Sequence, residues 1–427
     1  MTFPDRLSIP AEVIRIAEQL EGGGWETWCV GGAIRDHLLH QENKDFDLAT
    51  AATPEQVTKL FERTIPIGKE HGTIAVLDRN GATHEVTTFR RDVKTDGRHA
   101  VVEFGVSLDE DLARRDFTIN AIAYHPLRHE WRDRFGGAQD LEDGVIRAVG
   151  TAWHRFREDY LRILRALRFA ARFGFTIEQA TWKAAKACVA GLQHLSAERV
   201  REEWFQGLRT ARRPSELLRL WVKVGAAGVW LTELGNGERG TGEEISRKRA
   251  RGATNSRVEV IDRFCPQDPV LITSYLSSDP IETLTRLRCS KAEIERGRGI
   301  AAFRHDLPEA DSDGAVRHWM SRAGDAVDDV VAIRLAEGEG DALGAAVAET
   351  RELGSALSIR DLAIDGVDLM RMGIQQGPEV GKIMRELLDA VLDDPRLNSK
   401  GELELFVKQL FPVPPSPFTP RAGSDSQ

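Results

Sequence analysis

The sequence predicts an α+β protein, in which a small N-terminal domain with a mixed β-sheet and helices precedes an all-helical remainder. Two observations predict this class. From residue 25 to about 150, short β-rich runs alternate with helices, whereas nearly everything after 151 has helical periodicity. The chain has 427 residues, more than one hydrophobic core usually holds, so we expect two to four domains.

Short apolar and β-branched runs define the elements of the N-terminal domain. An amphipathic helix is expected first, with Val13, Ile16 and Leu20 among its apolar residues. A hairpin turn is expected at "DRNG", where Asn80 and Gly81 would supply positive φ values. The candidate strands are residues 25–30, 45–50, 72–78, 83–89, 99–104 and 130–135.

Composition and charge describe an ordinary globular protein with a basic middle. Hydrophobic residues make up 41% and charged residues 29%, and no apolar run is long enough to span a bilayer. The N-terminus lacks a signal-peptide pattern, so we expect a cytoplasmic location. The four cysteines are far apart and are expected to be reduced core thiols. The formal charge is −9, yet residues 155–213 hold thirteen Lys or Arg against six Asp or Glu, which fits a nucleic-acid groove or a solvated helical face.

A pair of carboxylates in the second candidate strand points to chemistry. The strand reads "NKDFDLAT" at residues 43–50, so Asp45 and Asp47 point to the same side, with Cα atoms roughly 6.5 to 7 Å apart. Two carboxylates on one side repel each other unless a cation or a proton joins them. Mg²⁺ takes oxygen ligands and keeps substrate phosphates in its shell, so the pair fits a holder of metal-bound nucleoside triphosphate. Taken alone, the pattern also fits an ordinary surface strand.

A glycine turn lies about a dozen residues upstream. In "CVGGAIRDHLL" a strand is followed by Gly31 and Gly32, and then by a helix with Arg35 in its first turn. Glycines let the backbone approach a ligand, and a helix N-terminus offers N–H groups to phosphate, although plain turn geometry explains the same glycines. The turn and the carboxylate pair together indicate nucleotidyl transfer. Glu85 in "THEVTTF" is the candidate third carboxylate of a two-metal site, or else an exposed strand residue.

Five segments resemble, in order, the signatures of one family, the class II tRNA nucleotidyltransferases (CCA-adding type) and bacterial poly(A) polymerases. They span residues 25 to 205, about 40% of the chain, and the helical remainder is similar more loosely, most clearly over 365–398. The segments are "VGGAIRDHLLHQENKDFDLAT", "LARRDFTINAIAY", "FGGAQDLEDGVIRAVG", "FREDYLRILRALRFAARFGF" and "LSAERVREEW".

The resemblance implies how the chain is divided. Its parts would be a nucleotidyltransferase head with a palm-like catalytic domain at 1–150, a helical neck that selects the base at 151–210, a helical body at 211–340, and a helical tail that binds tRNA at 341–411. Within the body, residues 235–257 are rich in Gly and charge with little apolar content, so we expect a flexible loop there. Residues 412–427 are rich in Pro and Ser and are expected to be disordered.

The resemblance also assigns roles in the head. Gly31, Gly32 and Arg35 would hold the triphosphate, and Asp45 and Asp47 would hold the catalytic Mg²⁺ ions. These roles agree with what the residues themselves suggest.

In the second motif, Arg115, Asp116 and Asn120 would contact the phosphates and the ribose, whereas the alternative is a structural ion pair between Arg115 and Asp116. Arg165 and Arg168 would border the nucleotide or the RNA end.

The fourth motif would select the base. Asp159 and Arg162 are three apart on one predicted helix, so they could present an acceptor and a donor fork to the base edge. The resemblance implies that this pair selects CTP and ATP without a nucleic-acid template. Without the resemblance, the pair would be a surface salt bridge. Ser196, Glu198 and Arg199 of the fifth motif would brace this helix.

The implied reaction joins a tRNA 3′ end to a nucleotide. The 3′-hydroxyl attacks the α-phosphate of CTP or ATP, pyrophosphate leaves, and CMP or AMP is added to build or repair the CCA terminus. The helical body and tail would grip the acceptor stem and the corner of the tRNA through phosphate and 2′-hydroxyl contacts. No membrane partner is implied.

Three alternatives stay open. A bacterial poly(A) polymerase shares the head, but "IPIGKEHGTIAV" at 65–76 lacks the basic run that usually follows the first motif in those enzymes. An enzyme that adds only A fits as well as one that adds CCA, while a purely CC-adding enzyme is disfavoured because residues 90–112 are long enough for the flexible loop of A-adding enzymes. A non-catalytic RNA-binding protein would not need the carboxylate pair. The helical region has no His-Asp dipeptide, so no phosphohydrolase activity is expected.

Overall fold

The computed structural model describes residues 2–43, 45–68, 72–95, 100–235 and 253–410. The chain divides into two compact units, Met1–Ile294 and Glu295–Gln427, which are described separately here. Most of the predicted 235–257 loop, and the C-terminal segment expected to be disordered, lie outside the described residues.

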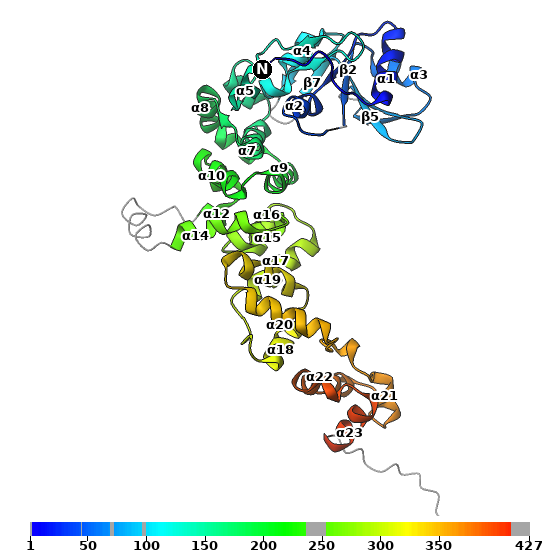
Figure 1. The fold of residues 1–427 in the computed structure, drawn as a ribbon, viewed down its shortest axis with the longest axis vertical. Coiled ribbons are helices and arrows are strands. Elements are labelled where there is room, and N and C mark those ends of the chain that lie inside the picture. The colour runs from blue at the N-terminus through cyan, green and yellow to red at the C-terminus, as the bar shows by residue number, and fades with distance from the viewer. Residues whose placement is uncertain (1, 44, 69–71, 96–99, 236–252, 411–427) are drawn as a thin grey trace, which may run out of the picture. The chain divides into compact units, whose positions relative to one another are not determined.

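The first unit begins with a seven-stranded mixed sheet (Figure 1), in the order β3-β4-β5-β2-β1-β8-β9. Its strands are β1 (Thr27–Val30), β2 (Asp47–Thr50), β3 (Thr64–Gly68), β4 (Thr73–Leu77), β5 (Thr83–Thr88), β8 (Ala123–Tyr124) and β9 (Trp131–Arg132). The remaining strands are β6 (Arg90–Thr95) paired with β7 (Ala100–Phe104), and β10 (Val145–Ile146) paired with β11 (Thr176–Ile177).

The pairing of β1, β2 and β5 places the predicted carboxylates at one edge of the sheet. β1 and β2 are antiparallel with Val30 opposite Asp47, so the end of β1 and the start of β2 coincide. β2 and β5 are parallel with Leu48 opposite Val86, which brings Glu85 next to the start of β2.

Helices cover the sheet and enclose its core. They are α1 (Ala11–Gly22), α2 (Gly32–Leu38), α3 (Pro54–Leu60), α4 (Leu108–Ala113), the short 3₁₀ helix η2 (Thr118–Asn120) and α5 (Gly137–Asp143). α1 and α3 pack beside β2, β4 and β5 (Figure 1). A core cluster under the central strands contains Trp28, Val30, Phe89, Leu112 and Val149. As expected, α1 buries Val13, Ile16 and Leu20.

All six candidate strands are found, and among the described residues five further strands were missed. β3 contains Pro66 and lies at the sheet edge, and three of its five residues are exposed, so it lacks the alternation of a half-buried strand. The hairpin between β4 and β5 also differs from expectation, because only Gly81 has a positive φ, +85°. The described parts of residues 90–112, where a flexible loop was expected, form the β6–β7 hairpin and most of α4.

Apart from β11, the described remainder of the first unit is helical, as predicted. Its helices are α6 (Ala152–Glu158), α7 (Leu161–Phe173), α8 (Gln179–Cys188), α9 (Ala197–Thr210), α10 (Pro214–Val224), α11 (Ala227–Trp230), α12 (Thr232–Gly235), α14 (Ala253–Val260), α15 (Pro269–Leu276), α16 (Pro280–Arg286) and the start of α17 (Lys291–Phe303). α7 packs against α9 and α10. Trp204 and Trp221 lie edge to face in the core between α9 and α10, with ring centroids 4.9 Å apart.

The second unit is also helical. After the end of α17 it contains α18 (Asp313–Ala323), α19 (Val327–Glu337), α20 (Asp341–Glu352), α21 (Gly366–Arg371), α22 (Pro378–Asp393) and α23 (Lys400–Leu410). One core cluster is built around Trp319 and Val330, and another around Leu369 and Leu387.

Two further expectations can be checked. All four cysteines are free thiols, but Cys265 is exposed and is therefore not a core residue, whereas the other three are buried. None of the helices among the described residues combines the length and apolar character needed to cross a membrane.

Gly137 allows α5 to pack directly against η2, which carries Asn120. A Cβ at this position would lie 2.3 Å from the carbonyl oxygen of Thr118 and 2.8 Å from Ile122 Cγ1. We expect Gly137→Ala to lower the melting temperature of the sheet domain by several degrees, equivalent to about 2 kcal/mol, because the backbone must shift. Gly22→Ala at the end of α1, where nothing lies within 4 Å, is the control and should be neutral or slightly stabilising. Equal melting temperatures for the two variants would contradict this account.

Candidate active site at the arginine row

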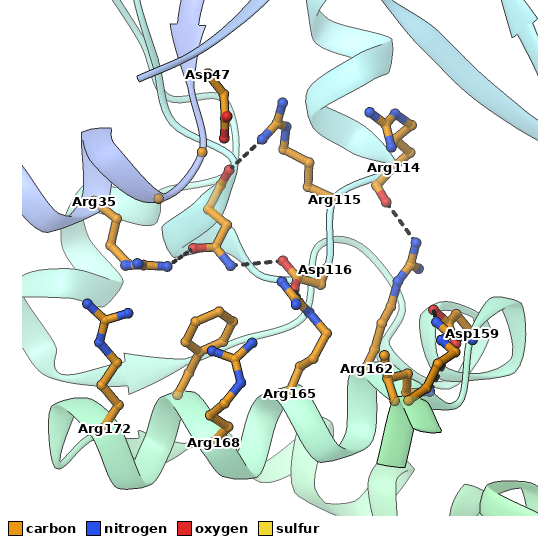
Figure 2. Close-up of a pocket in the computed structure, with 16 residues that line it drawn as sticks. Arg35, Asp47, Arg114, Arg115, Asp116, Asp159, Arg162, Arg165, Arg168 and Arg172 are labelled. Carbon is orange, nitrogen blue, oxygen red and sulfur yellow. Dashed lines mark hydrogen bonds and ion pairs between the residues drawn. The ribbon is translucent and has the colours of Figure 1, made fainter. Parts of the chain in front are cut away.

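A cavity of about 510 Å³ separates the glycine turn and β2 from helix α7 (Figure 2). Most of its lining side chains are charged, and eight of them are arginines. The lining residues are Gly31, Gly32, Arg35, Asp47, Arg114, Arg115, Asp116, Asn120, Asp159, Leu161, Arg162, Arg165, Arg168, Phe169, Arg172 and Arg199. The cavity therefore brings together most of the residues predicted for the site.

The turn between β1 and α2 forms one edge of the cavity. Gly31 has a φ of +81°, and a Cβ there would lie 3.0 Å from Asp47 Oδ2. A side chain at this position would thus be strained and would also press on the carboxylate. The glycine leaves the Asp47 carboxylate accessible from the cavity.

The carboxylates Asp45, Asp47 and Glu85 interact electrostatically. Burial, then the charge of Glu85, then that of Asp45, raise the pKa of Asp47 to about 6, and the charge of Arg115 opposes this shift. Asp45 and Glu85 are exposed, and neither belongs to the cavity lining given above. Within the described part of the chain, no three Asp, Glu, His or Cys side chains form a group that could hold a metal ion by themselves.

These carboxylates nevertheless fit a divalent cation. A raised pKa means that negative charge at Asp47 is poorly compensated by its surroundings, and a bound cation would compensate it. A two-carboxylate holder also leaves coordination positions for substrate phosphates, which Mg²⁺ favours.

Arg35 and Asn120 lie at the floor of the cavity. Arg35 is buried, donates through Nε and Nη2 to Asp36 Oδ1 at 2.8 and 2.7 Å, and donates through Nη1 to Asn120 Oδ1 at 2.7 Å. Its guanidinium also lies over the rings of Phe169 and Phe173. Arg35 is therefore fixed in place before any ligand arrives.

Arg115 and Asp116 do not form the ion pair that was the structural alternative. Arg115 donates to Asp111 Oδ2 at 3.2 Å, whereas Asp116 accepts from Arg165 Nε at 2.8 Å and from Asn120 Nδ2 at 2.9 Å. Burial opposes ionisation, but the charge of Arg165 and the hydrogen bonds lower the pKa of Asp116 to about 2. Asp116 is therefore an anion at neutral pH.

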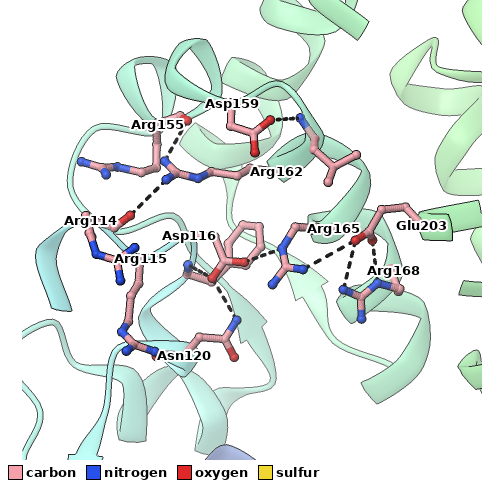
Figure 3. A network of polar contacts seen from close by, with 12 residues as sticks. Arg114, Arg115, Asp116, Asn120, Arg155, Asp159, Arg162, Arg165, Arg168 and Glu203 are labelled. Atoms are coloured by element: carbon pink, nitrogen blue, oxygen red, sulfur yellow. Dashed lines mark hydrogen bonds and ion pairs between the residues drawn. The ribbon is translucent and has the colours of Figure 1, made fainter. Parts of the chain in front are cut away.

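Four arginines line one face of α7 (Figure 2), and each contacts a carboxylate from a different segment. Figure 3 shows two of these pairs, Arg165 with Asp116 and Arg168 with Glu203. Arg162 donates to Glu158 at 2.7 Å, and Arg165 donates to Asp116 at 2.8 Å. The other two pairs are Arg168 with Glu203 at 2.6 Å and Arg172 with Asp36 at 3.2 Å. We call Arg162, Arg165, Arg168 and Arg172 the arginine row.

Asp159 and Arg162 do not share a helix, contrary to the prediction. Asp159 is the residue that ends α6, with φ −152°, and α7 begins at Leu161. Both still line the cavity, side by side in Figure 3. Asp159 Oδ1 accepts from the N–H of Leu161, the first residue of α7, at 3.0 Å. Asp159 also accepts from Arg199 at 2.7 Å, a contact in line with the predicted bracing role of Arg199.

The sequence reasoning gave no role in the site to three residues that hold it together. Arg172 follows Arg168 by four positions, so helical spacing alone could have placed it in the row. Asp36 directly follows Arg35, a predicted site residue, so its position in the sequence could have indicated it. Glu203 gave no such signal, because it contacts Arg168 across 35 residues of sequence.

Comparison with known protein families defines the class of protein. A family described as "Poly A polymerase head domain" matches residues 27–147, and one described as "Probable RNA and SrmB- binding site of polymerase A" matches residues 174–234. The crystal structure of the Bacillus stearothermophilus CCA-adding enzyme in complex with CTP has a TM-score of 0.75 and 30% identity, over 93% of this chain and 96% of that one. The fold is thus that of a nucleotidyltransferase.

Curated relatives narrow the class to one family. The CCA-adding enzyme of Streptococcus gordonii is 34% identical over 409 residues, which cover 93% of this chain and 97% of the relative. That of Lactiplantibacillus plantarum is 47% identical over 191 residues, which cover 44% of this chain and 46% of the relative. The chain belongs to the CCA-adding enzyme family.

The raised pKa of Asp47 predicts that this carboxylate destabilises the metal-free protein. Above pH 6 the Asp47 carboxylate is ionised in both states, and its ionisation costs more free energy in the folded state than in the unfolded state. Asp47→Asn should therefore raise the free energy of unfolding at pH 7.5 by about 1 to 3 kcal/mol. The gain should shrink as the pH falls below about 6, because the wild-type carboxyl is then protonated in the folded state. Urea denaturation in EDTA at pH 7.5 and pH 5 measures both values.

Glu62→Gln, which removes an exposed carboxylate of the same domain, is the matched control and should change stability little. An Asp47→Asn variant no more stable than this control at pH 7.5 would contradict the argument.

Proposed function

We propose that this protein adds C and A nucleotides to the 3′ end of tRNA, from CTP and ATP and without a nucleic-acid template, to build or repair the CCA terminus. The observation that supports this most directly is the cavity in which the glycine turn and Asp47 lie opposite the arginine row. The side with the glycine turn and Asp47 suits a metal-bound triphosphate, and the side with the arginine row suits a polyanion and the edge of a base. The proposed reaction places the protein in the cytoplasm with its tRNA substrates.

We assign the triphosphate and the metal to the turn side of the cavity. Gly31 and Gly32 would admit the phosphates to the backbone, and Asp45 and Asp47 would hold Mg²⁺, with Glu85 as the third carboxylate. When bound, Mg²⁺ favours deprotonation of the RNA 3′-hydroxyl and neutralises charge on the α-phosphate and on the departing pyrophosphate.

The floor of the cavity would orient the nucleotide. Arg115 lines the cavity beside Asp47 (Figure 2), and its Nη1 donates to the backbone oxygen of Asn120 at 3.4 Å, so its guanidinium would meet a phosphate bound at the turn. Asp116 accepts a hydrogen bond from the Asn120 carboxamide, and both side chains would contact the ribose and the phosphates. Arg35, at the floor of the cavity, would add positive charge near the triphosphate and would hold the Asn120 carboxamide in place.

Base selection would fall to Asp159 and Arg162. Arg162 donates to two backbone carbonyls, of Arg155 and Arg114, both at 3.1 Å, and so is oriented before a base enters. A guanidinium and a carboxylate held in this way offer donors and an acceptor to the Watson–Crick edges of C and A. Arg165 and Arg168 would border the nucleotide or the RNA end.

We further propose that the helical parts serve the RNA. The domains assigned from the sequence remain head 1–150, neck 151–210, body 211–340 and tail 341–411, with the body and tail gripping tRNA by shape. The Thermotoga maritima CCA-adding enzyme complexed with tRNA has a TM-score of 0.64 at 22% identity, a likeness of fold alone.

Incubation of the protein with Mg²⁺ and labelled tRNA transcripts tests this function directly. We expect a transcript that ends before CCA to gain C, C and one A from CTP and ATP, and EDTA to abolish addition because the triphosphate then lacks its cation. Addition of A only, on the CC-ending transcript, would replace the proposal with an A-adding enzyme. Long A tails on any RNA would replace it with a poly(A) polymerase.

Truncation of Arg162 tests the base-selection assignment. We expect Arg162→Ala to lower kcat/KM for both CTP and ATP by about 100-fold, because a charged donor to the base is lost. Arg157→Ala is the control, since Arg157 lies on α6, outside the cavity lining, and stacks on Trp153 at 4.4 Å. Steady-state kinetics on the CC-ending and the shorter transcripts give both values, and similar losses in the two variants would refute the assignment.

A further inference from the structure

Asn43 joins two parts of the head that the sheet does not join. Its carboxamide accepts the backbone N–H of Asp45 at Oδ1, over 2.9 Å, and donates through Nδ2 to Asp36 Oδ2, over 3.0 Å. Paired residues of β2 begin only at Asp47, so the sheet ladder does not position Asp45. The Asn43 side chain therefore fixes the backbone of Asp45 relative to helix α2.

Asp36 is the point at which this contact meets the arginine row. Its buried carboxylate accepts from Arg35 at Oδ1 and from both Asn43 and Arg172 at Oδ2. Arg172 is the last member of the row on α7, and Arg35 in turn holds Asn120 at the cavity floor. One carboxylate is thus hydrogen-bonded to the metal-side segment, the floor and α7.

We propose that Asn43 is a positioning residue that couples Asp45 to the arginine row through Asp36. The inference rests on the proposed function, in which Asp45 helps to hold the divalent cation. Asn43 itself touches neither the nucleotide nor the cation. It holds the Asp45 backbone where the carboxylate can reach the cation, and it transmits the position of α7 to that carboxylate.

A purely local role for Asn43 makes a different prediction. A side chain that accepts the N–H two residues ahead forms a common turn, and serine can form the same turn, although more weakly than asparagine. Serine is too short to donate to Asp36 as well. Asn43→Ser therefore keeps the local turn and breaks the coupling, whereas Asn43→Ala removes both.

Binding of Mn²⁺ to the full-length protein with saturating CTP and no RNA tests the coupling. Electron paramagnetic resonance measures free Mn²⁺, so turnover is not needed. We expect both Asn43→Ala and Asn43→Ser to weaken Mn²⁺ binding about tenfold, the usual effect of removing a group that orients a metal ligand. Gln41→Ala, a change at an exposed neighbour on the same segment, should bind Mn²⁺ as the wild type does.

A double-mutant cycle separates coupling from simple damage. Arg172→Ala should weaken Mn²⁺ binding in the wild type but add little in the Asn43→Ser background, because the link is already broken. Melting temperatures within about two degrees of the wild type would show that the fold is intact. Wild-type affinity in Asn43→Ser, or additive losses in the cycle, would overturn the coupling. A wild-type protein that binds no Mn²⁺ with CTP would overturn the proposed function, and the inference with it.

Discussion

The structure of the site depends on the pairing of each arginine in the row with a carboxylate from another segment. Four guanidinium groups on one face of α7 would repel one another, and the partial burial of each would add a cost of several kcal/mol if it were unpaired. The compensating charges come from α6, from the segment before η2, from α9 and from α2. Helix α7 is therefore attached to four segments by the residues that line the cavity.

This arrangement makes the arginines rigid without neutralising the cavity. A guanidinium has five donors, and a carboxylate that pairs with it uses at most two or three, so the carboxylates alone do not use all the donors of the row. Because Arg168 and Glu203 are both buried, the loss of either would leave an unpaired charge, and the pair persists only as a unit. Donors fixed in this way need little rearrangement when charge develops in a transition state.

Sequence reasoning found the parts of the site that are local and missed the parts that are not. Short motifs contain the glycine turn, the strand with Asp47 and the segment 114–116, and the structure gathers all three around one cavity. The break between α6 and α7 escaped notice because the apolar spacing continues in phase across Asp159 and Tyr160, and a period cannot reveal one residue that leaves the helix. Glu203 and the two-residue strand β8 were missed for another reason, since both are defined by tertiary neighbours distant in sequence.

The two sides of the cavity have opposite charge, and this restricts what can bind between them. On one side lie the four arginines of the row, and on the other Asp47, whose pKa of about 6 reflects its burial and the nearby Glu85 and Asp45. A bare triphosphate is attracted by the first side and repelled by the second, and a free cation experiences the reverse. A cation bound to a triphosphate satisfies both sides at once, because it meets the carboxylates while the phosphate oxygens meet the arginines. The charge separation therefore favours the metal-bound nucleotide over either component alone.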